Sequence, residues 1–156
     1  MAPTIHATCL LIGAVGVLVR GPSGAGKSAL AAQLVEAERA GGRYAQLVSD
    51  DRVAVAAVNG RLVARAPSEI AGRLELRGFG IVATDFETAA VVRLVVDIVD
   101  LADAERLPEP GALVTTIEGL RLARQPVCGT GWQACAAVRA RILAERFGIE
   151  RENPTI

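Results

Sequence analysis

The sequence of 156 residues has little of what builds metal clusters, disulfide frameworks or membrane spans. It holds one histidine and three widely spaced cysteines, Cys9, Cys128 and Cys135, which form no zinc-binding pattern and predict reduced thiols. The longest apolar run, 91–99, is interrupted by two charged residues and cannot span a bilayer. The first 20 residues carry no charged leader or cleavage signal, so we expect a cytoplasmic protein.

An excess of charge of one sign is also missing, because 17 Lys and Arg residues balance 17 Asp and Glu residues. Without a basic surplus, we expect neither a nucleic-acid partner nor a membrane partner. The sequence shows no internal repeat, linker or low-complexity segment. Its length and its apolar content of 51% predict one domain, over 1–148, followed by a polar tail, 149–156.

The stretch 21–28, GPSGAGKS, fits the phosphate-binding pattern G-x-x-x-x-G-K-[ST] of a P-loop. An apolar strand is expected before it, at 15–19, and a helix after it, at 27–40. This strand–loop–helix setting supports the motif over its alternative, a chance glycine-rich turn. We therefore predict that a nucleoside triphosphate binds with magnesium at Gly21, Pro22, Ser23, Gly24, Ala25, Gly26, Lys27 and Ser28.

Each part of this loop suits phosphate chemistry. The three glycines let the backbone curl so that its N–H groups face phosphate oxygens. The helix that follows directs its positive N-terminal end at the same anion. Lys27 can reach the β- and γ-phosphates, and the Ser28 hydroxyl can hold Mg²⁺.

Two adjacent carboxylates, Asp50 and Asp51, follow a short apolar strand expected at 45–48. In a parallel or mixed sheet, strand ends beside the P-loop face the phosphates. One carboxylate could contact magnesium there, and the other could accept a proton from an incoming hydroxyl. The alternative is an ordinary Asp-rich turn.

The segments 53–58 and 62–66 flank Asn59-Gly60, which predicts a type I′ hairpin. A doubly wound fold would have a helix here, so the expected sheet is mixed. Further strands are expected at 5–12, 16–20, 91–100, 113–117 and 120–123, with 91–100 central, and a second helix at 131–147. The apolar positions of that helix include Trp132, Cys135, Ala136, Val138, Ile142 and Leu143.

The stretch 74–81, LELRGFGI, places Glu75 and Arg77 two residues apart. On a strand, such residues share one face. A carboxylate and a guanidinium there, followed by two glycines, suit magnesium and phosphate contacts. A surface ion pair on a half-buried strand is the alternative.

Together these features resemble the catalytic domain of bacterial HPr kinase/phosphorylase. The resemblance rests on four features in the right order: His6 on the first strand, the P-loop 21–28, the segment 48–53 (VSDDRV), and 74–81. The last matches the family's signature stretch, of the form LEIRGLGI. Close similarity covers residues 5–82, and the later strands and helix match loosely.

The resemblance implies an α/β fold with a mixed β-sheet around a P-loop core, like that of phosphoenolpyruvate carboxykinase. It implies an enzyme, a protein-serine kinase that uses ATP and Mg²⁺ to phosphorylate the phosphocarrier protein HPr and so regulates the phosphotransferase system. In the reverse direction, the family also dephosphorylates HPr.

The resemblance also implies roles for residues. Asp50 would be the base that takes the serine proton, and the acid in the reverse reaction. Lys27 would stabilise the transferred phosphoryl group, while Ser28 and Glu75 would ligate magnesium. His6 would lie at the active site, although a lone histidine, taken by itself, is more often structural.

Arg106 falls near an active-site arginine of the family, in a region where the spacing differs. Asp51 and Arg77 complete the candidate active-site residues.

Two departures from the family pattern stand out. The sequence begins where the family's catalytic domain begins, so we expect the usual N-terminal domain to be absent, as in the short form of some alphaproteobacteria. The family's loop of the form PVRPGRN, linked to dephosphorylation, is replaced by 126–132, PVCGTGW, without either arginine. Phosphorolysis, control by metabolites and the family's homo-oligomeric assembly are therefore open questions for this chain.

The prediction is thus an HPr kinase, and two alternatives stay beside it. A P-loop kinase of a small metabolite would need an enclosed acceptor pocket, which little in the sequence supports. A non-catalytic nucleotide-sensing regulator is favoured slightly by the missing arginines, but intact Lys27, Ser28, Asp50 and Glu75 argue against it.

Overall fold

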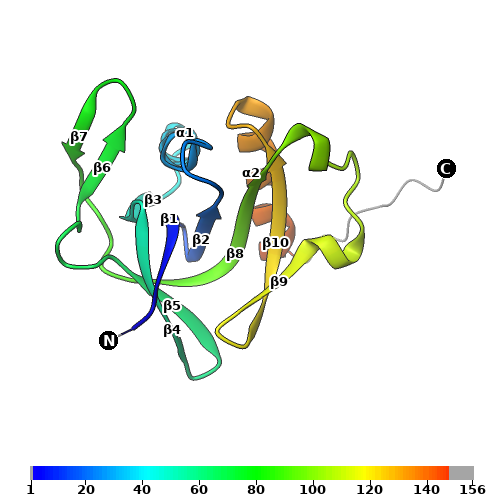
Figure 1. Ribbon diagram of the computed structural model, residues 1–156, viewed down its shortest axis with the longest axis horizontal. Coiled ribbons are helices and arrows are strands. Elements are labelled where there is room, and N and C mark those ends of the chain that lie inside the picture. The colour runs from blue at the N-terminus through cyan, green and yellow to red at the C-terminus, as the bar shows by residue number, and fades with distance from the viewer. Residues whose placement is uncertain (1, 148–156) are drawn as a thin grey trace.

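The computed structural model describes residues 2–147, and its elements are arranged as a curved sheet with two helices packed against it (Figure 1). In chain order they are β1 (Thr4–Ile12), β2 (Val15–Arg20), α1 (Lys27–Ala40), β3 (Ala45–Ser49), β4 (Arg52–Val58), β5 (Arg61–Arg65), β6 (Arg73–Leu76), β7 (Gly80–Ala83), β8 (Ala90–Val99), η1 (Leu101–Asp103), η2 (Pro110–Leu113), β9 (Val114–Ile117), β10 (Leu120–Cys128) and α2 (Trp132–Phe147). The predicted tail, 149–156, lies outside the described residues, so the domain boundary at 148 stays a prediction.

Five strands of the main sheet close into a ring. β2 pairs antiparallel with β1 and parallel with β8, and the ring returns from β8 through β5 and β4 to β1. β10 and then β9 extend the sheet from β8, while β3 pairs with the second half of β1. The sheet is therefore mixed, as the sequence predicts. The β4–β5 hairpin is also confirmed, and Asn59 and Gly60 both have the positive φ angles of a type I′ turn.

The ring divides the hydrophobic core into two layers. Alternate side chains of β2 and β8, such as Leu18 and Val95, point into the ring and are fully buried there. Their neighbours Val17 and Leu94 point outward and pack with Leu34 and the rest of α1 and α2. Because each such side chain stabilises the fold by about 1.5–3 kcal/mol on burial, the two layers together fix the strands that carry the P-loop.

One close contact between the start of β2 and β8 requires glycine. The pairing of β2 with β8 shifts register between Gly16 and Val17, which leaves Arg93 as an extra residue on β8. A methyl group on Gly16 would lie 2.3 Å from the carbonyl oxygen of Val91. That distance is shorter than any van der Waals contact, so a side chain at this position would push the two strands apart.

Two expectations about the later chain were wrong. The stretch 74–81 is a hairpin, β6 and β7, which forms a separate two-stranded sheet, and Arg77 lies in its turn and not on the strand that carries Glu75. β10 continues past 123 to Cys128, because it pairs with β8 over those residues. β9 pairs with β10 only as far as Ala123, so Pro126, which lacks an N–H donor, lies where the other side of the strand needs no partner. The second helix is confirmed as α2, and Trp132 begins it with 78% of its surface exposed.

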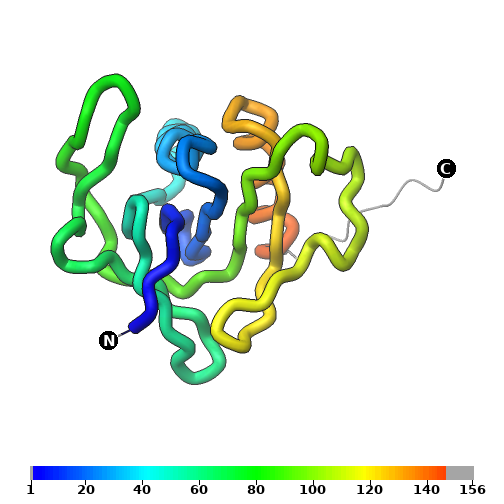
Figure 2. The backbone as a smooth tube through the Cα atoms, in the orientation of Figure 1, coloured from blue at the N-terminus to red at the C-terminus, as the bar shows by residue number. Residues whose placement is uncertain are grey.

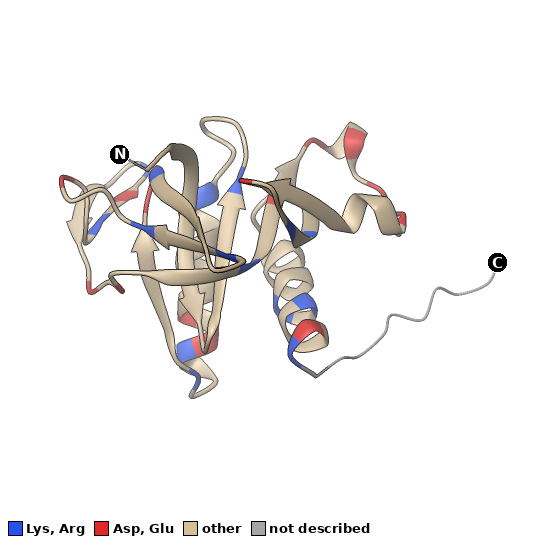
Figure 3. Ribbon diagram, turned by 90° about the horizontal axis from the view of Figure 1, so that it is seen from below, with Lys and Arg blue, Asp and Glu red and all other residues tan. Residues whose placement is uncertain are grey.

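The three cysteines are free thiols, as predicted. Cys9 lies inside the ring, and burial raises the pKa of its thiol to about 12. Within residues 2–147, no helix combines the length and apolarity that crossing a membrane requires. Positive and negative residues are interspersed along the strands and α2 (Figure 3).

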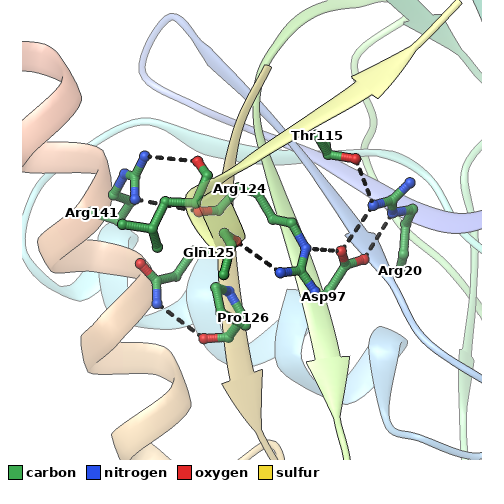
Figure 4. A network of polar contacts seen from close by, with 9 residues as sticks. Arg20, Asp97, Thr115, Arg124, Gln125, Pro126 and Arg141 are labelled. Atoms are coloured by element: carbon green, nitrogen blue, oxygen red, sulfur yellow. Dashed lines mark hydrogen bonds and ion pairs between the residues drawn. The ribbon is translucent and has the colours of Figure 1, made fainter. Parts of the chain in front are cut away.

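An ion-pair network links the end of β2 to β8 and to the middle of β10 (Figure 4). Asp97 accepts two hydrogen bonds from Arg20, each of 2.8 Å, and one from Arg124. Arg20 also donates to the Thr115 hydroxyl at 3.3 Å. Burial alone would raise the pKa of Asp97, but the hydrogen bonds from both arginines outweigh it and hold that pKa below its ordinary value. Since Arg20 directly precedes Gly21, the network fixes the strand from which the P-loop starts.

We predict that Asp97→Asn lowers the free energy of unfolding by about 2 kcal/mol at pH 7, because two partly buried guanidinium groups lose their counter-charge. Because the pKa of Asp97 is lowered in the folded state, its carboxylate stabilises the fold fully at pH values above the ordinary Asp pKa. This stabilisation is lost as the pH falls toward and through the lowered pKa of the folded state. The difference between wild type and variant should therefore shrink below about pH 4. Urea unfolding at pH 7 and pH 3 measures both values.

The exposed Asp103 provides the matched control, and Asp103→Asn should change stability by less than about 0.5 kcal/mol at either pH. An Asp97→Asn variant with wild-type stability at pH 7 would contradict a structural role for the network.

Candidate active site

The P-loop lies between the end of β2 and the start of α1, with the β6–β7 hairpin on one side and the turn that leads into α2 on the other (Figure 2). Gly24 and Gly26 have φ angles of +80° and +96°, which favour glycine, and the Ala25 N–H closes the turn on the Pro22 carbonyl at 3.0 Å. The loop thus has the curled backbone that the motif predicts. Its remaining N–H groups and the N-terminus of α1 can receive an anion.

Lys27, the one lysine in the sequence, is the first residue of α1 and is 7% exposed. Its ammonium group donates to the carbonyls of Gly21 at 3.0 Å and Pro22 at 3.1 Å. The side chain therefore lies back across the loop. A phosphate that binds in the loop would therefore contact an ammonium group that is already held in place, which reduces the entropy cost of ordering the lysine side chain on binding.

Asp50 is the centre of the polar contacts beside the P-loop. One carboxylate oxygen accepts hydrogen bonds from the Ser28 hydroxyl at 2.6 Å and the Thr8 hydroxyl at 2.8 Å. The other accepts from the backbone N–H of Glu75 at 3.1 Å. Three elements, β1, α1 and the β6–β7 hairpin, thus hold one nearly buried carboxylate in a fixed orientation.

Asp51 points away from Asp50, because the chain bends sharply between β3 and β4. Asp51 has a φ of +67°, rare for a residue with a side chain, and the Arg52 N–H bonds the Asp50 carbonyl at 2.8 Å. On the exposed side of this bend, His6 Nε2 lies 3.0 Å from Asp51 Oδ1. With side chains 48% and 68% exposed, this pair contributes little stability, and both groups stay accessible to a partner from solvent.

Arg77 reaches the P-loop from the turn of the hairpin. A methyl group on Gly24 would lie 3.6 Å and 3.7 Å from the two terminal nitrogens of Arg77, so its guanidinium lies over the loop. Although Arg77 does not share a strand face with Glu75, the hairpin brings both to the P-loop. Arg77 provides a cation above Gly24, and Glu75 provides the backbone N–H that orients Asp50.

Two residues in contact with these groups were missed by sequence reasoning. Thr8 is fully buried on β1 and bonds Asp50. A single hydroxyl within the apolar run of β1 is the signal that could have identified it. Thr130, in the turn before α2, contacts Gly26 so closely that a methyl group there would lie 2.5 Å from Thr130 Cγ2. No motif marks this contact.

The structure does not bring Arg106 to the P-loop. Its exposed side chain instead lines a cavity of about 600 Å³ with Gln125 and Cys128 of β10 and residues of α2. A catalytic role for Arg106 stays a prediction.

The donor set fits Mg²⁺ held together with a nucleotide. The Ser28 hydroxyl, at the start of α1, is a hard oxygen donor of the kind that magnesium takes in P-loop proteins. Its hydrogen bond of 2.6 Å to the Asp50 carboxylate holds it in place. Residues 2–147 hold no cluster of three or more acidic, histidine or cysteine side chains that could bind a metal alone. Phosphate oxygens and water would therefore supply most of the coordination, which is usual for this ion.

The family model "HPr Serine kinase C-terminal domain" matches residues 1–107. The chain is 36% identical over 78 residues to the HPr kinase/phosphorylase of Clostridium beijerinckii, a match that covers 50% of this chain and 24% of that protein. It is 37% identical over 84 residues to the HPr kinase/phosphorylase of Clostridium perfringens, covering 53% and 25% respectively. The match thus spans about a quarter of the length of these relatives.

The fold is similar to a solved structure, the Hpr(Ser) kinase/phosphatase from Coxiella burnetii. The TM-score is 0.77 at 25% sequence identity, and the alignment covers 92% of this chain and 99% of that one. The mixed-sheet fold predicted from the sequence is therefore confirmed beyond the residues that the family model matches.

We predict that Thr8→Val lowers the free energy of unfolding by about 1–2 kcal/mol, because the nearly isosteric valine leaves Asp50 with one hydrogen-bond donor fewer in a buried setting. Thr8→Ser, which keeps the hydroxyl, should recover most of the loss. Urea unfolding of the three proteins measures this. Equal losses in both variants would mean that the threonine methyl group, and not its hydrogen bond, matters.

Proposed function

Because the chain belongs to the HPr serine kinase C-terminal domain family, we propose that it is a protein-serine kinase that transfers the γ-phosphoryl group of ATP, with Mg²⁺, to a serine of the phosphocarrier protein HPr. The observation that carries this proposal is the Asp50 carboxylate, which is held beside the P-loop by Thr8, Ser28 and the Glu75 N–H. A base fixed at the γ-phosphate end of a P-loop is what transfer to a hydroxyl requires.

In this mechanism, the P-loop N–H groups, Lys27 and Arg77 hold the phosphates and stabilise the charge of the transition state. Bound Mg²⁺ would neutralise phosphate charge beside the Ser28 hydroxyl, with Glu75 as a further ligand. Asp50 orients the serine hydroxyl and takes its proton. A positioned base contributes about 10²–10⁴-fold to the rate, so Asp50 is the residue on which turnover depends most.

The exposed side of the site suits a protein acceptor better than a small metabolite. His6 and Asp51 are both open to solvent next to Asp50, and the hairpin beyond them exposes Phe79 and Ile81. A small-metabolite kinase would enclose its acceptor to exclude water. We therefore assign the His6–Asp51 pair to the acceptor side of the site.

The proposal includes a cytoplasmic location, which suits three free thiols, and a kinase that acts without nucleic acid or membrane. It also includes assembly into a homo-oligomer, which size-exclusion chromatography with light scattering can test. The reverse reaction, in which inorganic phosphate removes the phosphoryl group from HPr, is a separate outcome of the assay below.

We predict that the protein transfers labelled phosphate from MgATP to HPr of the same organism, and that Asp50→Asn lowers this transfer at least about 10²-fold. ATP affinity should change by only a few fold, because the Asp50 side chain lies beside the P-loop and is not part of it. Transfer assays and calorimetric titration with MgATP measure the two effects.

The exposed Asp85 provides the matched control, and Asp85→Asn should transfer phosphate at the wild-type rate. HPr with its acceptor serine changed to alanine should receive no label. Wild-type protein that binds ATP but does not label HPr would refute this acceptor and favour a nucleotide sensor or another substrate.

A further inference from the structure

This inference rests on the proposed function, whose chemistry is in-line phosphoryl transfer. The in-line geometry determines the direction in which the nucleoside extends from the P-loop. The attacking hydroxyl and the leaving oxygen lie on opposite sides of the transferred phosphoryl group. Asp50 lies on the side of β3 and β1 and marks the side of attack. The rest of the nucleotide must therefore extend the other way, past β2 toward the ends of β8 and β10.

That side of the loop is well defined. β8 runs parallel to both β2 and β10, so the carboxyl ends of these three strands lie at the same edge of the sheet as the P-loop. Ligands of open α/β sheets bind at this edge. Thr130, two residues beyond the end of β10, contacts Gly26 directly. The chain between Cys128 and Thr130 thus joins the P-loop to the space beside β10.

The cavity of about 600 Å³ opens at this place. Val99 and Cys128, at the ends of β8 and β10, form part of its wall, and one flank of α2 forms another part. Its volume falls within the range of small-molecule sites, about 300–1,000 Å³. The α2 flank presents four alanines to the cavity over three turns, with Ala137 among the central ones, and the longer side chains of Gln133 and Arg141 also line it.

Gln125 gives the cavity a specific polar group. It is 9% exposed and points from β10 toward α2 (Figure 4). Its amide nitrogen donates to the Pro126 carbonyl at 3.0 Å, which sets the orientation of the amide because that carbonyl can only accept. Among the described residues, its side-chain oxygen has no hydrogen-bond donor. A cavity left by loose packing would be apolar, whereas this one presents a fixed acceptor.

We propose that this cavity binds the base of the nucleotide, and that the Gln125 side-chain oxygen accepts a hydrogen bond from the 6-amino group of adenine. A 6-oxo purine presents an acceptor at the same position, so two oxygens would face each other. The site therefore prefers adenine to hypoxanthine. The flat apolar faces of the base lie between the alanines of α2 and the wall formed by Val99 and Pro126.

The test compares three ligands with Mg²⁺: ADP, IDP and pyrophosphate. Pyrophosphate engages the P-loop alone, whereas IDP differs from ADP in having a 6-oxo group in place of the 6-amino group and a hydrogen on the adjacent N1. Calorimetry gives the affinities. Trp132, the one tryptophan of the chain, precedes the cavity-lining Gln133 and provides a fluorescence signal as a second readout.

We predict that wild-type protein binds ADP about fivefold or more tightly than IDP, the effect of one hydrogen bond. Gln125→Met, which removes the acceptor at similar volume, should bring the two affinities together. Ala137→Leu, which fills the cavity, should weaken ADP at least tenfold and leave pyrophosphate within twofold. Ala136→Leu, on an exposed face of the same helix, is the matched control and should alter neither.

The outcomes separate this inference from the proposed function. Binding of pyrophosphate with unchanged ADP affinity in Ala137→Leu would refute the base site and leave the P-loop function intact. Equal affinity of wild type for ADP and IDP would refute the role of Gln125. If neither ADP nor pyrophosphate binds, both the base site and the proposed function are wrong.

Discussion

The Asp50 carboxylate is the constraint on which the arrangement of the site depends. Burying a polar group without partners costs about 2–7 kcal/mol, so this side chain is tolerated only because Thr8, Ser28 and the Glu75 N–H all donate to it. Those donors come from a strand, a helix and a hairpin that belongs to a separate sheet. Satisfying one carboxylate therefore sets the positions of three elements around the P-loop.

The geometry of β1 explains why the two consecutive aspartates have different surroundings. β1 pairs with β4 over its first half and with β3 over its second half, and Asp50 and Asp51 lie between those two strands. The left-handed backbone of Asp51 absorbs the bend. As a result, Asp50 faces the start of α1 while Asp51 faces His6 and solvent. One local irregularity thus separates the buried carboxylate that we propose as the base from the exposed pair that we propose faces the acceptor.

The parts of the fold and of the site that depend on short stretches of sequence could be predicted. The helix 27–40, the Asn59–Gly60 hairpin and the P-loop follow from residue types at short spacings, and the mixed sheet follows from the hairpin. Closure of the ring by β2 and β8 could not be predicted, because it joins residues more than 70 positions apart through a glycine contact. Arg77 was placed on a strand because periodicity alone does not show where a short hairpin turns. The approach of Thr130 to Gly26 has no sequence pattern at all.

The two sides of the P-loop also differ in charge, and this bears on the direction of the reaction. Lys27 and Arg77 lie at the loop itself, where they can stabilise phosphate in transfer from a nucleotide. The segment 126–132, on the other side, carries no arginine, and its Thr130 packs against Gly26. Attack by inorganic phosphate brings a second anion to the site, which needs additional cations to offset the repulsion. Within the proposed function, the charges near the loop therefore favour transfer from ATP over phosphorolysis.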